Sequence, residues 1–172
     1  MWPMLEELQA KQDRLFALLE EMGEVMVAFS GGTDSAYLAW AANRVLGSKA
    51  IAITADSASI PGSHKRDAEE FVERFGIRHH YVDTHEFDNP DYVRNDANRC
   101  FHCKDELFTR LSGEGERLGV KTIVYGVNVD DTGDFRPGHR AAQQHEVRAP
   151  LLEAGLKKAE IRELSRRESL PT

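Results

Sequence analysis

One short segment, placed between an apolar run and a helical pattern, constrains this chain more than any other stretch. Residues 25–29 are all apolar, which is typical of a buried strand, and apolar residues recur at helical spacing over 36–46. The segment between them is Ser30-Gly31-Gly32-Thr33-Asp34-Ser35. A glycine-rich turn between a strand and a helix presents backbone N–H groups and a helix N-terminus, and both attract phosphate. The order of elements therefore predicts a phosphate-binding loop.

The residue types of this loop suit contact with phosphate. Gly31 and Gly32 permit backbone conformations that other residues resist, and they leave space for a ligand. The hydroxyls of Ser30 and Ser35 can donate hydrogen bonds, and the Asp34 carboxylate can hold a divalent cation. No lysine precedes Ser35, so the segment is not a Walker A motif. The alternative is an ordinary glycine turn capped by a polar side chain.

The rest of the chain alternates strands and helices. Short apolar runs predict further strands at 50–54, 79–82 and 122–126, and a short fifth strand at 147–151. Helical spacing predicts helices at 3–22, 36–46, 62–75, 101–118, 139–145 and 157–168. Alternation at βαβ spacing implies a parallel sheet with helices on both faces. We expect one α/β domain over residues 1–172, with helix 3–22 as an N-terminal extension.

The ends of three predicted strands point to one shared site. Parallel sheets bind ligands outside the carboxyl ends of their strands, and these ends are Ser30, Thr54 and Gly126. Each runs into a loop rich in glycine or aspartate. Residues 84–98 form fifteen residues without periodicity, a length that is typical of a functional loop in a compact domain.

Charge and hydropathy disfavour two classes of partner. The formal net charge is −7, so the surface gains little from the counterion release that dominates nucleic-acid affinity. No apolar run approaches the ~20 residues that a membrane span needs, and the N-terminus lacks the basic region of a signal peptide. We therefore expect a cytoplasmic protein that binds neither nucleic acid nor a membrane.

The two cysteines of the chain, Cys100 and Cys103, are separated by two residues. In a chain without an export signal, this spacing indicates redox or metal chemistry rather than a structural disulfide. Two alternatives are a pair of incidental thiols and half of a zinc site. No histidine completes an obvious zinc-binding spacing.

The loop segment Ser-Gly-Gly-x-Asp-Ser resembles the pyrophosphatase loop (PP-loop) of the ATP pyrophosphatases. This resemblance implies cleavage of ATP between the α and β phosphates, with transfer of AMP to a carboxylate or carbonyl oxygen and release of pyrophosphate. It also implies a Rossmann-like (adenine nucleotide alpha hydrolase) five-stranded parallel sheet in the order 3-2-1-4-5. ATP and Mg²⁺ are the cofactors that it implies.

Four further stretches resemble the ATP-dependent sacrificial sulfur transferases of the LarE family: 54–61, 98–108, 126–138 and 148–156. The match covers nearly the whole chain in the same order, and Asp-Asp-x-Gly-Asp-Phe-Arg-Pro-Gly at 130–138 is its most specific part. The resemblance implies a step in nickel-pincer nucleotide cofactor biosynthesis. A carboxylate on a pyridinium mononucleotide is adenylated, and a sulfur nucleophile displaces AMP to give a thiocarboxylate. A thiolate is a strong nucleophile for such a displacement.

The candidate site residues follow from the loops and from this resemblance. Asp34, Asp131 and Arg136 are the candidate catalytic residues, and Asp34 is also the candidate Mg²⁺ ligand. We expect ATP to contact Ser30, Gly31, Gly32, Thr33, Asp34, Ser35, Thr54 and Gly126. We expect the dicarboxylate substrate to contact Arg99, Lys104, Asp134 and Arg136. The resemblance also implies that Cys100 and Cys103 are two of the three cysteines that carry a 4Fe–4S cluster in some family members.

Two other functions fit the loop. One is another PP-loop adenylating enzyme, for tRNA thiolation or as an amidotransferase synthetase, but the acidic surface disfavours tRNA and no glutaminase nucleophile precedes the loop. The other is a non-catalytic adenine-nucleotide-binding module, which would not need Asp34 or the acidic loop. Family members continue with a C-terminal domain that these 172 residues do not include. The resemblance further suggests a homo-oligomer.

Overall fold

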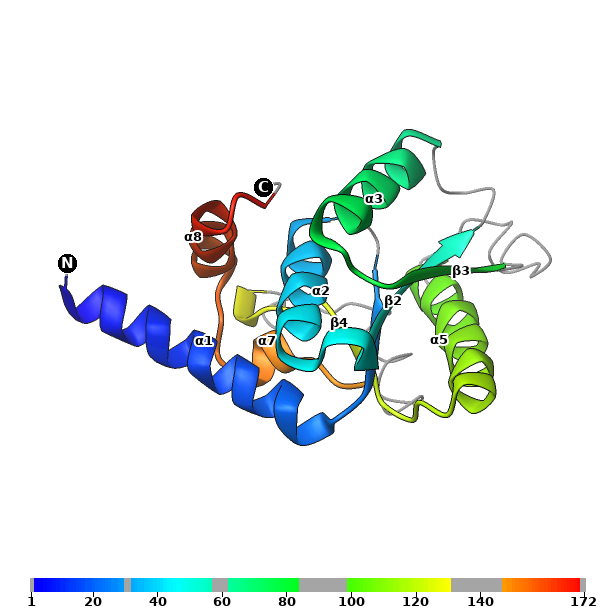
Figure 1. Ribbon diagram of the computed structural model, residues 1–172, viewed down its shortest axis with the longest axis horizontal. Helices are drawn as coiled ribbons and strands as arrows, with labels where there is room; N and C mark the ends of the chain where they lie inside the picture. The colour runs from blue at the N-terminus through cyan, green and yellow to red at the C-terminus, as the bar shows by residue number, and fades with distance from the viewer. Residues whose placement is uncertain (1, 30–31, 57–61, 84–98, 131–146, 171–172) are drawn as a thin grey trace.

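Four parallel strands form one sheet in the order β3-β2-β1-β4 (Figure 1). The computed structural model describes residues 2–29, 32–56, 62–83, 99–130 and 147–170, with only the backbone described for 2–5, 62–64, 83 and 99–106. The strands are β1 (Val25–Ala28), β2 (Ala50–Asp56), β3 (His79–Asp83) and β4 (Ile123–Tyr125). The parallel α/β fold and the order of these four strands are confirmed.

In the described part of the chain, five helices lie at the positions that the sequence predicts: α1 (Trp2–Met22), α2 (Thr33–Leu46), α3 (Gly62–Phe75), α5 (Arg99–Leu118) and α8 (Lys158–Arg167). A sixth, α7 (Pro150–Glu153), is a short helix that the sequence analysis did not predict. The predicted helix at 139–145 and the predicted loop at 84–98 lie outside the described residues.

The central strand β1 and the first four residues of β2 are buried on both faces because they are apolar on both sides. The edge strand β3 is more polar, and its Tyr81 is exposed. One face of the sheet carries α2 and α3, with α1, α7 and α8 packed around α2, and the other face carries α5 (Figure 1). Alternate residues of β1 contribute to the two cores: Val27 to the first and Met26 to the second. Four alanines of α2 are at most 3% exposed, so this helix lies close to the sheet: Ala36, Ala39, Ala41 and Ala42.

The predicted fifth strand at 147–151 is wrong. Arg148 alone bridges β4, donating its N–H to the Ile123 carbonyl (2.9 Å) and accepting the Tyr125 N–H (3.0 Å). Pro150 then begins α7, since proline has no N–H to continue a ladder but suits the first position of a helix. The chain keeps the expected place beside β4 but leaves the sheet after one bridge.

Gln12 is the polar residue that interrupts the apolar stripe of α1, and the structure accounts for it. Its side-chain amide donates to the Tyr37 hydroxyl (3.0 Å). Tyr37 is fully buried, stacks on Trp40 and has its pKa raised to about 12 by burial. A buried phenol needs a hydrogen-bond partner, and Gln12 provides it where α1 crosses α2.

Replacing Gln12 with leucine should therefore destabilise the fold although it extends the apolar stripe. The Tyr37 hydroxyl would lose its partner in the core, at a cost of about 1–3 kcal/mol in the free energy of unfolding. Urea unfolding of Gln12→Leu, Tyr37→Phe and the double variant measures the coupling between the two side chains. We expect the double variant to be more stable than Gln12→Leu alone, and independent, additive losses would contradict this account.

Candidate functional site

The N-terminus of α2 faces the carboxyl ends of the central strands. Gly32 is its N-cap and provides no side chain to cap it. The Gly32 carbonyl accepts the Ala36 N–H (2.9 Å) and the Ser35 hydroxyl (3.2 Å), which fixes the first turn of the helix. Because the cap has no side chain, space is left where the positive end of the helix dipole attracts an anion.

The Asp34 carboxylate is the centre of the polar contacts at this edge. Its Oδ2 atom accepts the Asn128 side-chain amide at 2.9 Å. Its Oδ1 atom accepts the Lys158 ammonium at 3.0 Å. Asn128 follows β4 and Lys158 begins α8, so Asp34 joins three segments that are distant in sequence. The side chain of Asp34 is 16% exposed and that of Lys158 33%, so both charges lie partly out of water and remain within reach of a ligand.

The backbone around Lys158 is fixed by contacts from two other elements. Its N–H donates to Asp130 Oδ2 at 2.9 Å, which caps the first turn of α8. The Val129 N–H donates to the Leu156 carbonyl, also at 2.9 Å. Glu160 accepts the Lys157 N–H at 3.0 Å and pairs with Lys11 of α1 at 2.9 Å. The start of α8 is therefore held in register with the loop after β4.

Gly126 allows the end of β4 to approach the start of α2. A Cβ atom at this position would lie 2.9 Å from the Ser35 nitrogen and 3.1 Å from Asp34 Cβ. Real Cβ atoms do not make such contacts with backbone, so any larger residue would push the two elements apart. The glycine is needed for the close approach that places Asn128 beside Asp34.

A cavity of about 160 Å³ lies between these elements. Its walls come from the end of β1, the first turn of α2, the end of β4 and the start of α8, and they consist of Ala28, Gly32, Thr33, Asp34, Ser35, Tyr125, Gly126 and Lys158. The cavity combines a helix N-terminus, an ammonium group and a carboxylate. This arrangement suits a phosphate group and a cation that accompanies it.

The structure brings five of the predicted nucleotide-contacting residues to this one cavity. They are Gly32, Thr33, Asp34, Ser35 and Gly126. Thr54 does not line it: the Thr54 side chain is buried, and its hydroxyl donates to the Phe29 carbonyl at 2.9 Å.

The other predicted site residues lie outside what the structure describes, fully or in their side chains. Ser30, Gly31, Asp131, Asp134 and Arg136 belong to undescribed segments. Arg99, Cys100, Cys103 and Lys104 lie in the first turns of α5, where only the backbone is described. Their roles stay predictions.

Sequence reasoning missed Asn128 and Lys158. Both come from elements predicted correctly, but their contact with Asp34 depends on how distant elements pack. Asn128 offered a weak signal, because it lies in the polar stretch that follows a strand of the sheet. Lys158 offered none, since it reads as one of two lysines on a surface helix.

The donor set around Asp34 fits Mg²⁺. This cation is usually held by one or two carboxylates together with phosphate oxygens of the substrate. Asp34 supplies one carboxylate, and each oxygen keeps a second lone pair beyond its contact with Asn128 or Lys158. Within the described residues, no group of three or more His, Cys, Asp or Glu side chains forms an all-protein metal site.

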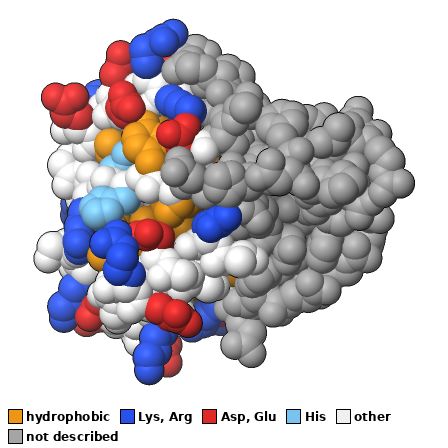
Figure 2. Space-filling view, turned by 90° about the vertical axis from the view of Figure 1, so that its right-hand side faces the viewer, with side chains coloured by type: hydrophobic (Ala, Val, Ile, Leu, Met, Phe, Trp, Pro, Cys, Tyr) orange, Lys and Arg blue, Asp and Glu red, His pale blue; other side chains and the backbone are white. Residues whose placement is uncertain are grey.

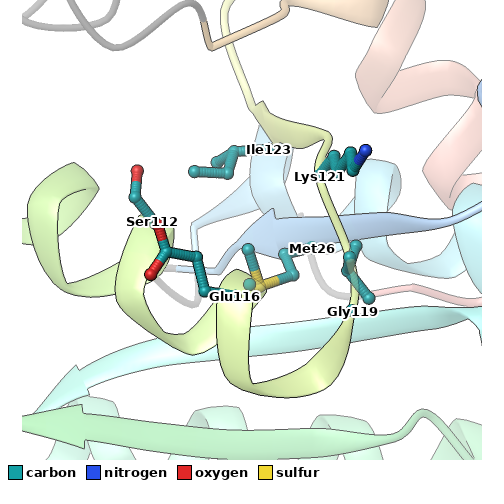
Figure 3. A pocket seen from close by; sticks show the side chains of 8 residues that line it. Met26, Ser112, Glu116, Gly119, Lys121 and Ile123 are labelled. Atoms are coloured by element: carbon teal, nitrogen blue, oxygen red, sulfur yellow. The ribbon is translucent and has the colours of Figure 1, made fainter.

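A larger cavity, of about 440 Å³, lies at the amino ends of the strands, opposite the cavity at Asp34 (Figure 3). It is bordered by the last turns of α5 and the starts of β1 and β4, where Ser112, Glu116 and Lys121 are its polar side chains. Met26 of β1 also borders this cavity, although its side chain is fully buried. This cavity shares no residue with the one at Asp34, and it lies at the amino ends of the strands rather than at their carboxyl ends.

The described surface does not present a single sign of charge on the face seen in Figure 2. Acidic and basic side chains alternate there around hydrophobic and histidine side chains. Among the described residues, no helix is both long enough and apolar enough to cross a membrane.

Sequence comparisons relate the chain to ATP-using enzymes. The family described as asparagine synthase matches residues 17–113, more than half of the chain. An uncharacterized protein, slr1717 from Synechocystis, is 40% identical over 95% of this chain and 61% of its own length. The pyridinium-3,5-bisthiocarboxylic acid mononucleotide synthase of Lactiplantibacillus plantarum is 28% identical over 92% of this chain and 58% of its own length. The chain thus spans about 60% of these curated relatives.

Solved structures with the same fold include two synthetases. The NMN synthetase of Francisella tularensis superposes with a TM-score of 0.74 at 16% identity, covering 95% of this chain and 71% of that protein. The NH₃-dependent NAD synthetase of Campylobacter jejuni gives a TM-score of 0.70, also at 16% identity, and the match covers 95% and 74%. At this identity the likeness establishes the fold alone.

The loop segment, the strand order and the sequence comparisons all indicate the same family. The resemblance to the PP-loop enzymes and to the sulfur transferases among them is confirmed by these relatives. The chain belongs to the asparagine synthase family of PP-loop ATP pyrophosphatases.

Proposed function

We propose that this protein adenylates a carboxylate of a pyridinium mononucleotide with ATP and then exchanges the adenylate for sulfur. The products would be pyrophosphate, AMP and a thiocarboxylate. The observation that carries the adenylation step is the cavity at the N-terminus of α2, where Lys158 and Asn128 hold Asp34. The sulfur-transfer step is supported by the 28% identical synthase of Lactiplantibacillus plantarum.

The cavity suits pyrophosphate as a leaving group. When the bond between the α and β phosphates breaks, negative charge grows on the departing β-phosphate oxygens. The N-terminus of α2 is fixed before the reaction, so it can stabilise this charge without reorganisation, and the Lys158 ammonium lines the same cavity. Mg²⁺, when bound at Asp34 and the phosphates, supplies a second positive charge at the same place.

The Lys158–Asp34 ion pair would respond to the nucleotide. Without phosphate, Lys158 neutralises Asp34 in a partly desolvated position. Asp34 would hold Mg²⁺ when Mg-ATP is bound, and Lys158 would then be able to pair with the phosphates instead. The exchange keeps both side chains paired in either state, which avoids leaving a buried charge uncompensated.

The sulfur step closes the reaction. With sulfide as the nucleophile, the new C–S bond forms, the bond from carbon to the AMP oxygen breaks, and the thiocarboxylate is the direct product. With a cysteine thiolate, the same displacement gives a thioester, and the cysteine Cβ–S bond must then break, with loss of the Cα proton, to release the thiocarboxylate. Cys100 and Cys103 lie at the start of α5, either as thiols or as two ligands of a 4Fe–4S cluster. Arg99, Lys104, Asp131, Asp134 and Arg136 are proposed to hold and orient the dicarboxylate substrate.

A second candidate function is amide formation by another branch of the same fold. It is proposed by analogy of fold alone, with the two synthetases named above as its basis. Both functions share adenylation and differ in the nucleophile, which would be ammonia in place of sulfur. We further propose a cytoplasmic homo-oligomer, on the basis of the family resemblance.

Substitution of Lys158 tests the adenylation step. We expect Lys158→Met to lower the rate of pyrophosphate release by about a hundredfold or more, because a preorganised donor to the leaving group is lost. The assay contains the full chain, Mg-ATP and pyridinium-3,5-dicarboxylic acid mononucleotide, and it measures pyrophosphate with time. Asp34→Asn should give a similar loss.

The matched control for this prediction is Lys157→Met, which removes the adjacent, exposed lysine of the same segment. It should release pyrophosphate at the wild-type rate. Equal rates for the Lys158 and Lys157 variants would contradict the role proposed for Lys158. ATP binding without any pyrophosphate, with sulfide or ammonia as nucleophile, would exclude both enzymatic functions.

Gly126→Ala should weaken nucleotide binding without a change of charge. The added Cβ would meet the Ser35 nitrogen and Asp34, so the first turn of α2 must shift at a cost of about 1–3 kcal/mol. Isothermal titration with Mg-ATP should show a Kd raised about tenfold. Gly113→Ala, placed in open space within α5, is the control and should bind normally. Normal binding by Gly126→Ala would show that this close approach is not needed for the site.

A further inference from the structure

A chain of two hydrogen bonds links the edge strand of the sheet to the entrance of the nucleotide loop. The Thr54 hydroxyl donates to the Phe29 carbonyl at 2.9 Å, and His79 Nε2 lies 2.7 Å from the same hydroxyl oxygen. Thr54 is 3% exposed and Phe29 2%, so bulk water does not compete for these bonds. Phe29 is the residue that immediately precedes the Ser30–Ser35 segment.

The number of available protons assigns the tautomer of His79. A hydroxyl carries one proton, and the contact between Thr54 and the carbonyl oxygen uses it. The Nε2 atom of His79 must then donate the proton in its own contact with Thr54. Burial lowers the pKa of His79, opposed by the charge of Glu69 and assisted by His80, so the ring is neutral at pH 7 with Nδ1 unprotonated.

The imidazole is held in place by its neighbours. Its ring meets the Phe29 ring edge-on at 5.9 Å and the Tyr81 ring at 4.8 Å. The Tyr81 hydroxyl donates in turn to Glu69 of α3 at 2.6 Å. His79 lies on β3, the edge strand of the described sheet, which α3 covers on this face (Figure 1). Its orientation is therefore set by packing, and not by the bond to Thr54 alone.

We propose that His79 is a positioning residue for the nucleotide loop and acts through Thr54. A peptide unit is planar, so a hydrogen bond to the Phe29 carbonyl fixes the plane of the peptide from which the loop begins. The other end of the loop is fixed at the Gly32 carbonyl by Ser35 and Ala36. The residues that flank the loop on its two sides, Phe29 and Gly32, are therefore each held by hydrogen bonds to their carbonyls. This inference rests on the proposed function, in that the loop is taken to bind ATP.

The first test measures the hydrogen-bond chain itself and does not depend on function. Nitrogen-15 NMR of the imidazole groups, recorded on the labelled full chain at pH 7, reports which ring nitrogen carries the proton. We expect the Nε2–H tautomer for His79, and a changed Nε2–H resonance in Thr54→Val. An Nδ1–H tautomer would overturn the proposal.

The second test measures the effect on the nucleotide. Thr54→Val and His79→Phe should each raise the Kd for Mg-ATP about two- to tenfold while kcat changes little, as expected for loss of one hydrogen bond. The double variant should bind no worse than either single variant, because the two bonds act as one unit. Thr54→Ser and His79→Gln, which keep a hydroxyl and a side-chain N–H donor, should bind close to wild type.

The outcomes separate the two proposals. If wild type binds Mg-ATP and both Thr54→Val and His79→Phe bind it equally well, His79 does not position the loop and the proposed function stands. If wild type does not bind Mg-ATP, both proposals fall. Melting temperatures of all variants identify any that fail to fold. Because Thr54 and His79 are substituted separately, a folding failure at one position still leaves the other variant for the test.

Discussion

The paired contacts of Asp34 are the interaction on which the rest of the site depends. Asn128 and Lys158, which lie 94 and 124 residues further along the chain, each contact one oxygen of this carboxylate. A partly buried charge is costly unless it is paired, so the carboxylate selects a fold in which all three segments meet. Loss of Lys158 would leave the Asp34 charge with the Asn128 amide alone, and loss of Asp34 would leave both Asn128 and Lys158 without this partner. The contacts that form the site are therefore the same contacts that hold α2, the loop after β4 and α8 together.

The parallel sheet makes this convergence possible. Because β1 and β4 pair in parallel, with Ala28 beside Tyr125, their carboxyl ends deliver the start of α2 and the loop after β4 to the same edge. Gly126 brings them to contact distance. Lys158 reaches the same point from α8, whose start is tied to Asp130. Apolar strands build the sheet, and a few polar residues at its edge determine what it binds.

Local patterns predicted most of the fold, and contacts between distant residues account for what was missed. The strands, the long helices and the phosphate loop follow from hydrophobic periodicity and glycine placement. The fifth strand failed because Pro150 favours a helix start over a ladder. Gln12 interrupts the apolar stripe of α1, and only its hydrogen bond to the Tyr37 hydroxyl, which the sequence does not reveal, explains why a polar residue lies there. Lys158 could not be assigned from the sequence, since its function depends on an aspartate in another element.

The most direct test of adenylation follows the carboxylate oxygen of the substrate. The full chain is incubated with Mg-ATP, sulfide and a pyridinium dicarboxylate mononucleotide whose carboxylates carry oxygen-18. The account predicts that the AMP released contains one oxygen-18 atom in its phosphate, because the carboxylate oxygen attacks the α-phosphate and leaves with it. Label found in inorganic phosphate, or AMP released without label, would contradict it.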